Sequence, residues 1–421
     1  MSTLHSKAAE AYQQKPEVVE RHDNTFFGVR QKRDRMAQAL PEWEDLREAA
    51  SQIKKHTATH LADYLGLGEL YVKDESYRFG LNAFKVLGGS FAMVKYISQK
   101  TGIPVDELSY KVLSSKKFKE TMGQTTFYSA TDGNHGRGVA WAANKLGQKA
   151  VIRMPRGSAQ TRLNNIRKEN ADAEILDLNY DECVRYVNDM ANKDPNGVMV
   201  QDTAWRGYTD IPGWIMQGYG TLSIEADRQM IANGCEYPTH IFIQAGVGSL
   251  AGSVAGYFAD KYKDHKPVIC VVEAGAADCL RRSAERADGK VVRVRGKLDT
   301  IMAGLSCGAP CTIGWDILRD TAEGFAGTPD WMSAMGTRIY GVPLHDDPQI
   351  TSGESGSVTM GFLYSIMMYK RFEPIRKYLR LNKKSRVLLV STEGNTDPVR
   401  FREVVWTGLY GIRHRGEELI K

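Results

Sequence analysis

The fold is decided by the stretch TTFYSATDGNHGRGVAWAANKLGQKAVIRM, residues 125–154. Its start at 125–130 is apolar and predicts a strand, residues 135–146 have the apolar spacing of a helix, and 150–154 predict a second strand. Strands that alternate with helices of this length form parallel sheets through right-handed crossovers. The stretch therefore predicts an α/β fold.

The same alternation continues on both sides of this stretch. We expect two α/β units, with the chain passing from one to the other and back: a large domain of residues 1–89 and 213–421 and a small domain of residues 90–212. Residues 101–123 look irregular, and Pro41-Glu42-Trp43 marks a helix start. Further strands are expected at 69–73, 174–178, 198–201, 240–244, 268–273 and 386–390, and helices at 91–98, 159–170, 181–192, up to about 232, and at 250–259.

The composition is that of a globular protein. Of 421 residues, 42% are hydrophobic and 25% charged, and the net charge of +6 is spread along the chain. No basic patch interleaved with aromatic residues predicts nucleic-acid binding, and no apolar run predicts a membrane span. Six cysteines lack C-x-x-C spacing, and nine histidines lack metal-ligand spacing. We therefore expect a cytoplasmic enzyme without a metal, with free thiols; Cys307 and Cys311 are close enough in sequence to meet.

One lysine stands in an apolar setting, in the stretch NAFKVLGGS at residues 82–90. Loss of solvation lowers the pKa of such a lysine, and the resulting free amine condenses with an aldehyde such as pyridoxal phosphate. By itself the pattern also fits an ordinary lysine whose stem is buried and whose ammonium reaches water. Lys85 is thus a candidate cofactor lysine that needs further support.

That support comes from a resemblance. Lys73-Asp74-Glu75 resembles the K-x-E strand end, and Ala83-Phe84-Lys85 the S-F-K segment, of the fold-type II pyridoxal-phosphate enzymes, which include serine and threonine dehydratases, cysteine synthase and tryptophan synthase β. The resemblance implies a two-domain α/β fold, pyridoxal 5'-phosphate as the cofactor, Lys85 as its covalent attachment point, a small amino-acid substrate and a homodimer.

The glycine-rich turn QAGVGSLAG, residues 244–252, lies between an expected strand and an expected helix. Small residues let backbone N–H groups approach a phosphate, and the helix N-terminus adds partial positive charge. A tight turn without a ligand explains the glycines equally well. The turn resembles the phosphate loop G-G-G-x-G of the same family, which implies that the cofactor phosphate is held by Gly246, Val247, Gly248, Ser249 and Leu250.

The loop SATDGNHG, residues 129–136, resembles the family's S-S-G-N-H-G loop. The resemblance implies that Asn134 contacts the ring oxygen of the cofactor. It also implies that the substrate carboxylate is bound here by Thr131, Asp132, Gly133 and His135. Asp132 replaces the Ser of dehydratases, and it fits equally the N-cap of the following helix. An anion beside a substrate carboxylate is costly unless a cation is also present.

Asp132 also indicates the substrate. A carboxylate attracts an ammonium leaving group, whereas dehydratases expel hydroxide. T-D-G-N-H-G, together with QDTAW at 201–205 and STEGNTDP at 391–398, resembles the diaminopropionate ammonia-lyases of the family. Asp202 is then a second carboxylate at the end of a strand, a common place for active-site groups in α/β folds. A role in a surface salt bridge is an equal alternative for Asp202. We expect Lys85, Asp132 and Asp202 to be catalytic, with either Asp removing the α-proton.

Near the C-terminus, Thr392 aligns with the family's Ser that faces the pyridine nitrogen, with Ser391 as the alternative. Glu354 either lies near the ring or caps a helix. The predicted reaction is α,β-elimination of 2,3-diaminopropionate to pyruvate and two ammonia, with both enantiomers as candidate substrates. The alternatives are a serine/threonine dehydratase or amino-acid racemase of the same fold, and a non-catalytic sensor.

Overall fold

The computed structural model describes residues 17–20, 55–286 and 288–411. The helix start predicted at Pro41-Glu42-Trp43 lies outside these ranges. Contacts divide the described chain into a smaller unit, residues 77–221, and a larger unit, residues 17–20, 55–76 and 222–411. The predicted domain boundaries, after residues 89 and 212, remain a prediction.

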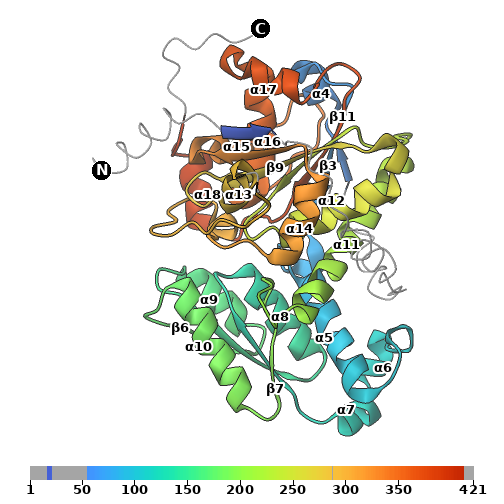
Figure 1. The fold of residues 1–421 in the computed structure, drawn as a ribbon, viewed down its shortest axis with the longest axis vertical. Coiled ribbons are helices and arrows are strands. Elements are labelled where there is room, and N and C mark those ends of the chain that lie inside the picture. The colour runs from blue at the N-terminus through green and yellow to red at the C-terminus, as the bar shows by residue number, and fades with distance from the viewer. Residues whose placement is uncertain (1–16, 21–54, 287, 412–421) are drawn as a thin grey trace. The chain divides into compact units, whose positions relative to one another are not determined.

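The larger unit is built on a seven-stranded sheet with the order β1-β10-β9-β8-β11-β3-β2 (Figure 1). The five inner strands run parallel, and the edge strands β1 and β2 pair antiparallel with their neighbours. The strands are β1 Glu17–Glu20, β2 Lys55–Thr57, β3 Glu69–Asp74, β8 His240–Gln244, β9 Val268–Ala274, β10 Gly324–Thr328 and β11 Arg386–Ser391.

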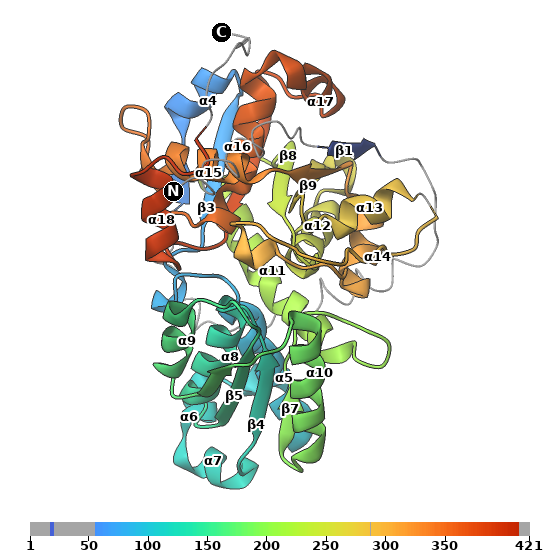
Figure 2. The same ribbon diagram turned by 90° about the vertical axis from the view of Figure 1, so that its left-hand side faces the viewer.

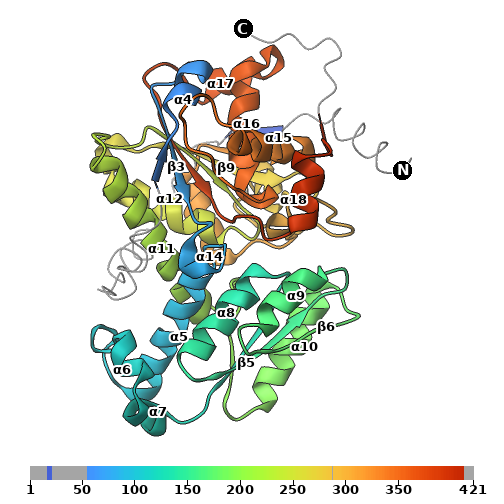
Figure 3. The ribbon, with the colours of Figure 1, turned by 180° about the vertical axis from the view of Figure 1, so that it is seen from behind.

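Helices flank this sheet, and α15 and α16 lie side by side (Figure 3). Glycines allow the close approach of these two helices, because a Cβ on Gly361 would lie 1.7 Å from the Met332 carbonyl oxygen and one on Gly336 would lie 2.0 Å from that of Ser357. The helices of this unit are α4 Thr59–Leu65, α12 Ser249–Lys261, α13 Cys279–Glu285, α14 Thr312–Thr321, α15 Asp330–Gly341, α16 Glu354–Met368, α17 Glu373–Tyr378 and α18 Pro398–Val405.

The smaller unit has a four-stranded parallel sheet with the order β6-β5-β4-β7, and α8 and α10 pack against its strands (Figure 2). Helix α11, Asp210–Ile231, crosses the boundary and contributes to both units. The other elements are α5 Val86–Thr101, α6 Tyr110–Ser114, α7 Lys116–Met122, β4 Thr126–Ala130, α8 Asn134–Lys145, β5 Lys149–Met154, α9 Gln160–Arg167, β6 Asp172–Ile175, α10 Tyr180–Lys193 and β7 Gly197–Met199.

The structure confirms the α/β fold and places most expected elements within a few residues. The expected strand at 174–178 is shifted, because β6 ends at Ile175. The expectation that residues 101–123 are irregular was wrong, since they contain α6 and α7, each begun by a serine whose side chain accepts a backbone N–H. Strand β10 was not predicted, because its sequence GFAGT has two glycines and one aromatic residue; burial between neighbouring strands outweighs that low propensity.

Candidate active site

Lys85 lies immediately before α5 in the smaller unit, at the end that packs against α8. The close packing requires glycine at 138, because a Cβ there would lie 2.8 Å from the Val86 Cα atom. On the other side, α11 requires glycine at 218, because a Cβ there would lie 2.4 Å from the Leu87 carbonyl oxygen. Backbone packing therefore fixes the position from which the Lys85 side chain extends.

The Lys85 ammonium forms an ion pair with Asp202. Its Nζ atom lies 2.7 Å from Asp202 Oδ2, and the exposed fractions of the two side chains are 19% and 7%. Asp202 follows β7, and Asp132 follows the adjacent parallel strand β4, so both carboxylates belong to the same sheet edge. The alternative of a surface salt bridge for Asp202 was wrong, because its side chain is buried against Lys85.

This ion pair overturns the expected effect of burial on Lys85. Burial alone lowers the pKa of this lysine, but the charges of Asp202, Tyr219 and Asp132 raise it, and the net pKa is raised above its ordinary value. Burial likewise raises the pKa of Asp202, yet Lys85 outweighs burial and lowers that pKa to about 2. In this arrangement the lysine is a protonated ammonium and Asp202 is a carboxylate.

The loop after β4 is held by Thr131 and not by Asp132. The Thr131 hydroxyl oxygen accepts hydrogen bonds from the backbone N–H groups of Gly133, at 2.9 Å, and Gly136, at 3.1 Å. Gly133 occupies the N-cap position of α8, so no N-cap side chain forms a capping hydrogen bond. The capping alternative for Asp132 was therefore wrong, because Thr131 already satisfies the first turn.

Asp132 instead contacts a buried cation. Arg162 Nη1 lies 3.3 Å from Asp132 Oδ2, and Arg162 is only 8% exposed. Its side chain also covers Gly133, where a Cβ would lie 2.8 Å from Arg162 Cδ. The cation that a carboxylate in this loop requires is thus supplied from α9. Sequence reasoning missed Arg162; the signal was a basic residue in the helix expected at 159–170.

Asn134 and His135 are the first two residues of α8. His135 is buried, and its Nε2 atom lies 2.9 Å from the Val200 carbonyl oxygen, so Nε2 carries the proton. Its Nδ1 atom lies 3.8 Å from Asp202 Oδ2. Burial lowers the pKa of His135, which leaves the ring neutral at pH 7. His135 therefore faces the Lys85–Asp202 pair as a neutral group.

In the larger unit, residues 245–248 join β8 to α12, and Ser249 and Leu250 are the first two residues of that helix. Gly248 precedes the helix with φ of 94°, a conformation that favours glycine. A Cβ on Gly246 would lie 3.1 Å from the Gly304 carbonyl oxygen and 3.2 Å from Cys307 Sγ. Both positions therefore favour glycine, and the backbone N–H groups at the start of this 13-residue helix carry the partial positive charge that suits a phosphate.

Thr392 follows β11, the strand beside β8, and is therefore at the same sheet edge as the glycine loop. Its hydroxyl oxygen lies 3.1 Å from Gln244 Nε2, at the end of β8. Ser391 donates instead to Ser352 Oγ, at 2.9 Å. Gln244 was not among the predicted site residues, although a polar side chain at the end of a buried strand is a recognisable signal.

The remaining expectations concern Glu354 and the cysteines. Glu354 is the first residue of α16, with Gly353 at the N-cap position, so Glu354 is not the cap. All six cysteines are free in the structure, Cys307 and Cys311 included. Within the described ranges, no cluster of three potential metal ligands occurs. None of the described helices combines the length and apolar content needed to span a bilayer.

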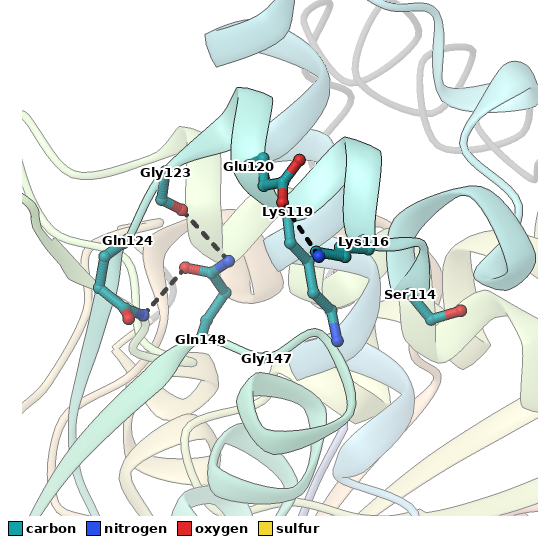
Figure 4. Close-up of a pocket in the computed structure, with 8 residues that line it drawn as sticks. All are labelled: Ser114, Lys116, Lys119, Glu120, Gly123, Gln124, Gly147 and Gln148. Atoms are coloured by element: carbon teal, nitrogen blue, oxygen red, sulfur yellow. Dashed lines mark hydrogen bonds and ion pairs between the residues drawn. The ribbon is translucent and has the colours of Figure 1, made fainter.

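A surface pocket in the smaller unit lies at the other end of its sheet (Figure 4). Gly123 and Gln124 precede β4, and Gly147 and Gln148 precede β5, whereas Asp132 and Asp202 follow their strands. Lysines of α7 complete the pocket. Because the amino and carboxyl ends of parallel strands lie at opposite edges of a sheet, this pocket is separate from the candidate active site.

Comparison with known proteins decides the family. Residues 49–341 match the family described as pyridoxal-phosphate dependent enzyme. The chain belongs to this family. Diaminopropionate ammonia-lyase from Salmonella typhimurium is 48% identical over 84% of this chain and 87% of its own length.

Two solved structures of the Escherichia coli diaminopropionate ammonia-lyase are also similar. The complex with D-serine has a TM-score of 0.85 and 39% identity, covering 95% of this chain and 99% of the other. The complex with an aminoacrylate-PLP azomethine reaction intermediate has a TM-score of 0.83 and 39% identity, covering 96% and 100%. These relatives confirm the predicted resemblance to diaminopropionate ammonia-lyases, the fold of type II and pyridoxal phosphate as the cofactor.

The residues of each unit fit this cofactor. The glycine loop has helix-start N–H groups that suit a phosphate, Thr392 has a neutral hydroxyl, and Lys85 has a side-chain nitrogen that would condense with the aldehyde once its ammonium loses a proton. The side chains present therefore fit the cofactor of the family. The role of each residue is a proposal.

Proposed function

We propose that this family member catalyses the α,β-elimination of 2,3-diaminopropionate, yielding pyruvate and two ammonia with consumption of one water. The observation that carries the proposal is that Asp202 lies 2.7 Å from the Lys85 ammonium and that a second carboxylate, Asp132, follows the adjacent parallel strand at the same sheet edge. A reaction that removes an α-proton and releases a β-amine needs a base and a cation-stabilising group within one site. Lys85, Asp132 and Asp202 supply both.

Lys85 is the proposed attachment point of pyridoxal phosphate. When bound, the cofactor withdraws electrons from the substrate's α-carbon and so makes the α-proton easier to remove. Asp202 holds the Lys85 side chain by their 2.7 Å contact and orients its amine. Asn134 contacts the cofactor ring oxygen, residues 246–250 bind the phosphate, and Thr392 faces the ring nitrogen.

The two carboxylates are proposed to serve the two enantiomers. D- and L-substrates present the α-proton to opposite faces of the cofactor, so one fixed base cannot act on both. Asp132 acts on one face, and Asp202 or Lys85 acts on the other. Their anchoring differs: Asp132 is paired with Arg162, and Asp202 is paired with Lys85.

The substrate carboxylate is proposed to bind at the loop Thr131–His135. The first turn of the 12-residue helix α8 favours an anion there, and Arg162 offsets the charge of Asp132. The Asp132 carboxylate then attracts the β-ammonium of diaminopropionate, whereas the β-hydroxyl of serine offers no positive charge. This difference argues against a serine/threonine dehydratase or racemase.

The test is the purified enzyme with D- and L-diaminopropionate, and with D- and L-serine, measuring pyruvate and ammonia. We expect both diaminopropionate enantiomers to release two ammonia per pyruvate, with kcat/KM at least about a hundredfold above that for serine. Turnover of serine at an equal rate would instead favour the dehydratase, and interconversion of enantiomers without pyruvate would favour the racemase.

We also propose a homodimer in the cytoplasm. The family resemblance supports the homodimer, and six free, mostly buried thiols suit a reducing compartment. Light scattering of the holoenzyme should give twice the 47.0 kDa chain mass, and a mass of one chain would refute the dimer.

A further inference from the structure

Gln244 makes an unusual set of contacts at the end of β8. Its side chain is 2% exposed, and its Nε2 atom has acceptors on both β11 and α16. These are the Val390 carbonyl oxygen at 2.9 Å, the Thr392 hydroxyl oxygen at 3.1 Å, the Ser355 carbonyl oxygen at 3.2 Å and the Gly356 carbonyl oxygen at 3.3 Å. The four oxygens share the two N–H groups of the amide, and Val390 and Thr392 are the nearest two.

These contacts fix which end of the Gln244 amide faces Thr392. Carbonyl oxygens only accept hydrogen bonds, so an amide oxygen in place of Nε2 would be repelled by three of them. An amide nitrogen cannot accept a hydrogen bond. The Thr392 hydroxyl is therefore the acceptor in its contact with Gln244, and its own proton remains to be donated to another group.

The hydroxyl of the neighbouring residue, Ser391, differs from that of Thr392 because it has an acceptor within the protein. Ser391 donates to Ser352 Oγ at 2.9 Å, and Ser352 in turn donates to the Gly353 carbonyl oxygen at 3.3 Å. The Ser391 proton is thus used within the protein. Of the two hydroxyls considered for the cofactor ring, Thr392 is the one that keeps a proton for a ligand.

We propose that Gln244 is a positioning residue that makes Thr392 a hydrogen-bond donor to the ring nitrogen of pyridoxal phosphate. This inference rests on the proposed placement of Thr392. A ring nitrogen that accepts a hydrogen bond from the neutral Thr392 hydroxyl stays unprotonated, because the proton remains on the hydroxyl oxygen, so the ring withdraws electrons less strongly than a protonated one. Gln244 contributes to this state without contacting the ring, by occupying a lone pair of the Thr392 oxygen.

The test is nitrogen NMR of the holoenzyme reconstituted with pyridoxal phosphate labelled with ¹⁵N in the ring. We expect the natural enzyme to show an unprotonated nitrogen that accepts a hydrogen bond. Thr392→Val should move the resonance to that of a nitrogen without a donor. Gln244→Leu should move the resonance in the same direction and weaken cofactor binding about tenfold. Without the Gln244 amide, the backbone carbonyl oxygens lose their donor, and the Thr392 hydroxyl donates partly to them and less to the ring nitrogen.

The double variant Gln244→Leu/Thr392→Val separates positioning from general structural damage. If Gln244 acts through Thr392, the double variant shifts the resonance no further than Thr392→Val alone. Ser391→Ala is the matched control and should leave the resonance in place. Gln244→Met, which keeps the side-chain length, replaces Gln244→Leu if the latter does not fold.

Two results overturn the inference in distinguishable ways. An unchanged resonance in Thr392→Val refutes the proposed placement of Thr392 and, with it, the role of Gln244. A shifted resonance in Thr392→Val with an unchanged one in both Gln244 variants refutes only Gln244. Shifts that add in the double variant likewise show that Gln244 does not act through Thr392.

Discussion

In both units the candidate site residues lie at the carboxyl ends of adjacent parallel strands. The side chains are charged in the smaller unit and neutral in the larger one. In the smaller unit, Asp132 and Asp202 follow the adjacent strands β4 and β7, and each is paired with a cation. In the larger unit, Gln244 ends β8 and Thr392 follows the adjacent strand β11, and the two side chains form a neutral hydrogen bond.

The two sites share their location in the sheet but differ in their proposed function. Both sites lie at the carboxyl ends of parallel strands, which is the edge at which open α/β sheets bind their ligands. In the proposed mechanism the charged site exchanges protons, and it depends on every partner, since removal of one buried ion leaves the other unpaired. The neutral site is proposed to hold a ligand in a fixed protonation state. The following predictions test this division, from the largest expected effect to the smallest.

Replacement of Lys85 should have the largest effect. Lys85→Ala removes the proposed attachment amine and leaves Asp202 without its cation, so kcat/KM for diaminopropionate should fall at least about 10³-fold. Borohydride reduction of the natural holoenzyme followed by peptide mapping should place the pyridoxyl group on Lys85. Lys95→Ala, on the same helix, is the control and should retain activity. A label on another lysine would exclude Lys85.

Asp132→Asn and Asp202→Asn should lose activity unequally toward the two enantiomers. Each variant should lose about 10²- to 10⁴-fold in kcat for the enantiomer whose proton it removes, and less for the other. The measurement is kcat for D- and L-diaminopropionate in both variants. Equal losses would indicate shared positioning, and full activity of Asp202→Asn would remove Asp202 from the mechanism.

Gly248→Leu should weaken cofactor retention. The backbone φ of 94° strains any side chain, and the new Cβ would lie 3.1 Å from Leu280 Cδ1. We expect the dissociation constant of pyridoxal phosphate to rise roughly ten- to a hundredfold. Titration of the apoenzyme measures it, with Gly256→Ala as the control, because a Cβ there meets only Ile317 at 3.4 Å. Unchanged affinity would count against the phosphate loop.

The charged site should also govern part of the acid stability. Because the folded state lowers the Asp202 pKa from 3.8 to about 2, its contribution is present above pH 4 and is lost as the pH falls through 2. The contribution is roughly 2 kcal/mol. Urea unfolding between pH 5 and 2 should show a smaller decline for Asp202→Asn than for the natural protein. Thr392→Val should decline like the natural protein; identical slopes in all three would refute the assignment.

The smallest effect is expected for Arg162→Gln. Loss of the guanidinium leaves Asp132 in the loop without its partner, so kcat should fall about tenfold for the enantiomer that depends on Asp132. The kcat values of both enantiomers measure the effect, and Arg162→Lys should recover part of it. Arg156→Gln, which breaks an exposed ion pair with Asp177, should change neither. Equal losses for both enantiomers would assign Arg162 to loop structure.

The sequence alone determined the fold class, the family and the residues at the strand ends. Apolar alternation is a local property, so the strand at 240–244 was predicted with the bounds that β8 has. The lysine segment, the glycine loop and T-D-G-N-H-G are each contiguous in sequence, so the sequence alone indicates their chemistry. The weak strand β10 was missed because its stability comes from neighbours distant in sequence.

The tertiary structure decided which charges meet. Lys85 and Asp202 are 117 positions apart, and Asp132 and Arg162 are 30 apart, so no local pattern pairs them. The pKa of Lys85 was predicted to fall because burial was the only visible influence; the structure raises it because a carboxylate lies 2.7 Å away. The direction of the Gln244–Thr392 hydrogen bond likewise depends on carbonyl oxygens of β11 and α16, which are distant from Gln244 in sequence. Electrostatic balance depends on distances between segments, which only the folded chain sets.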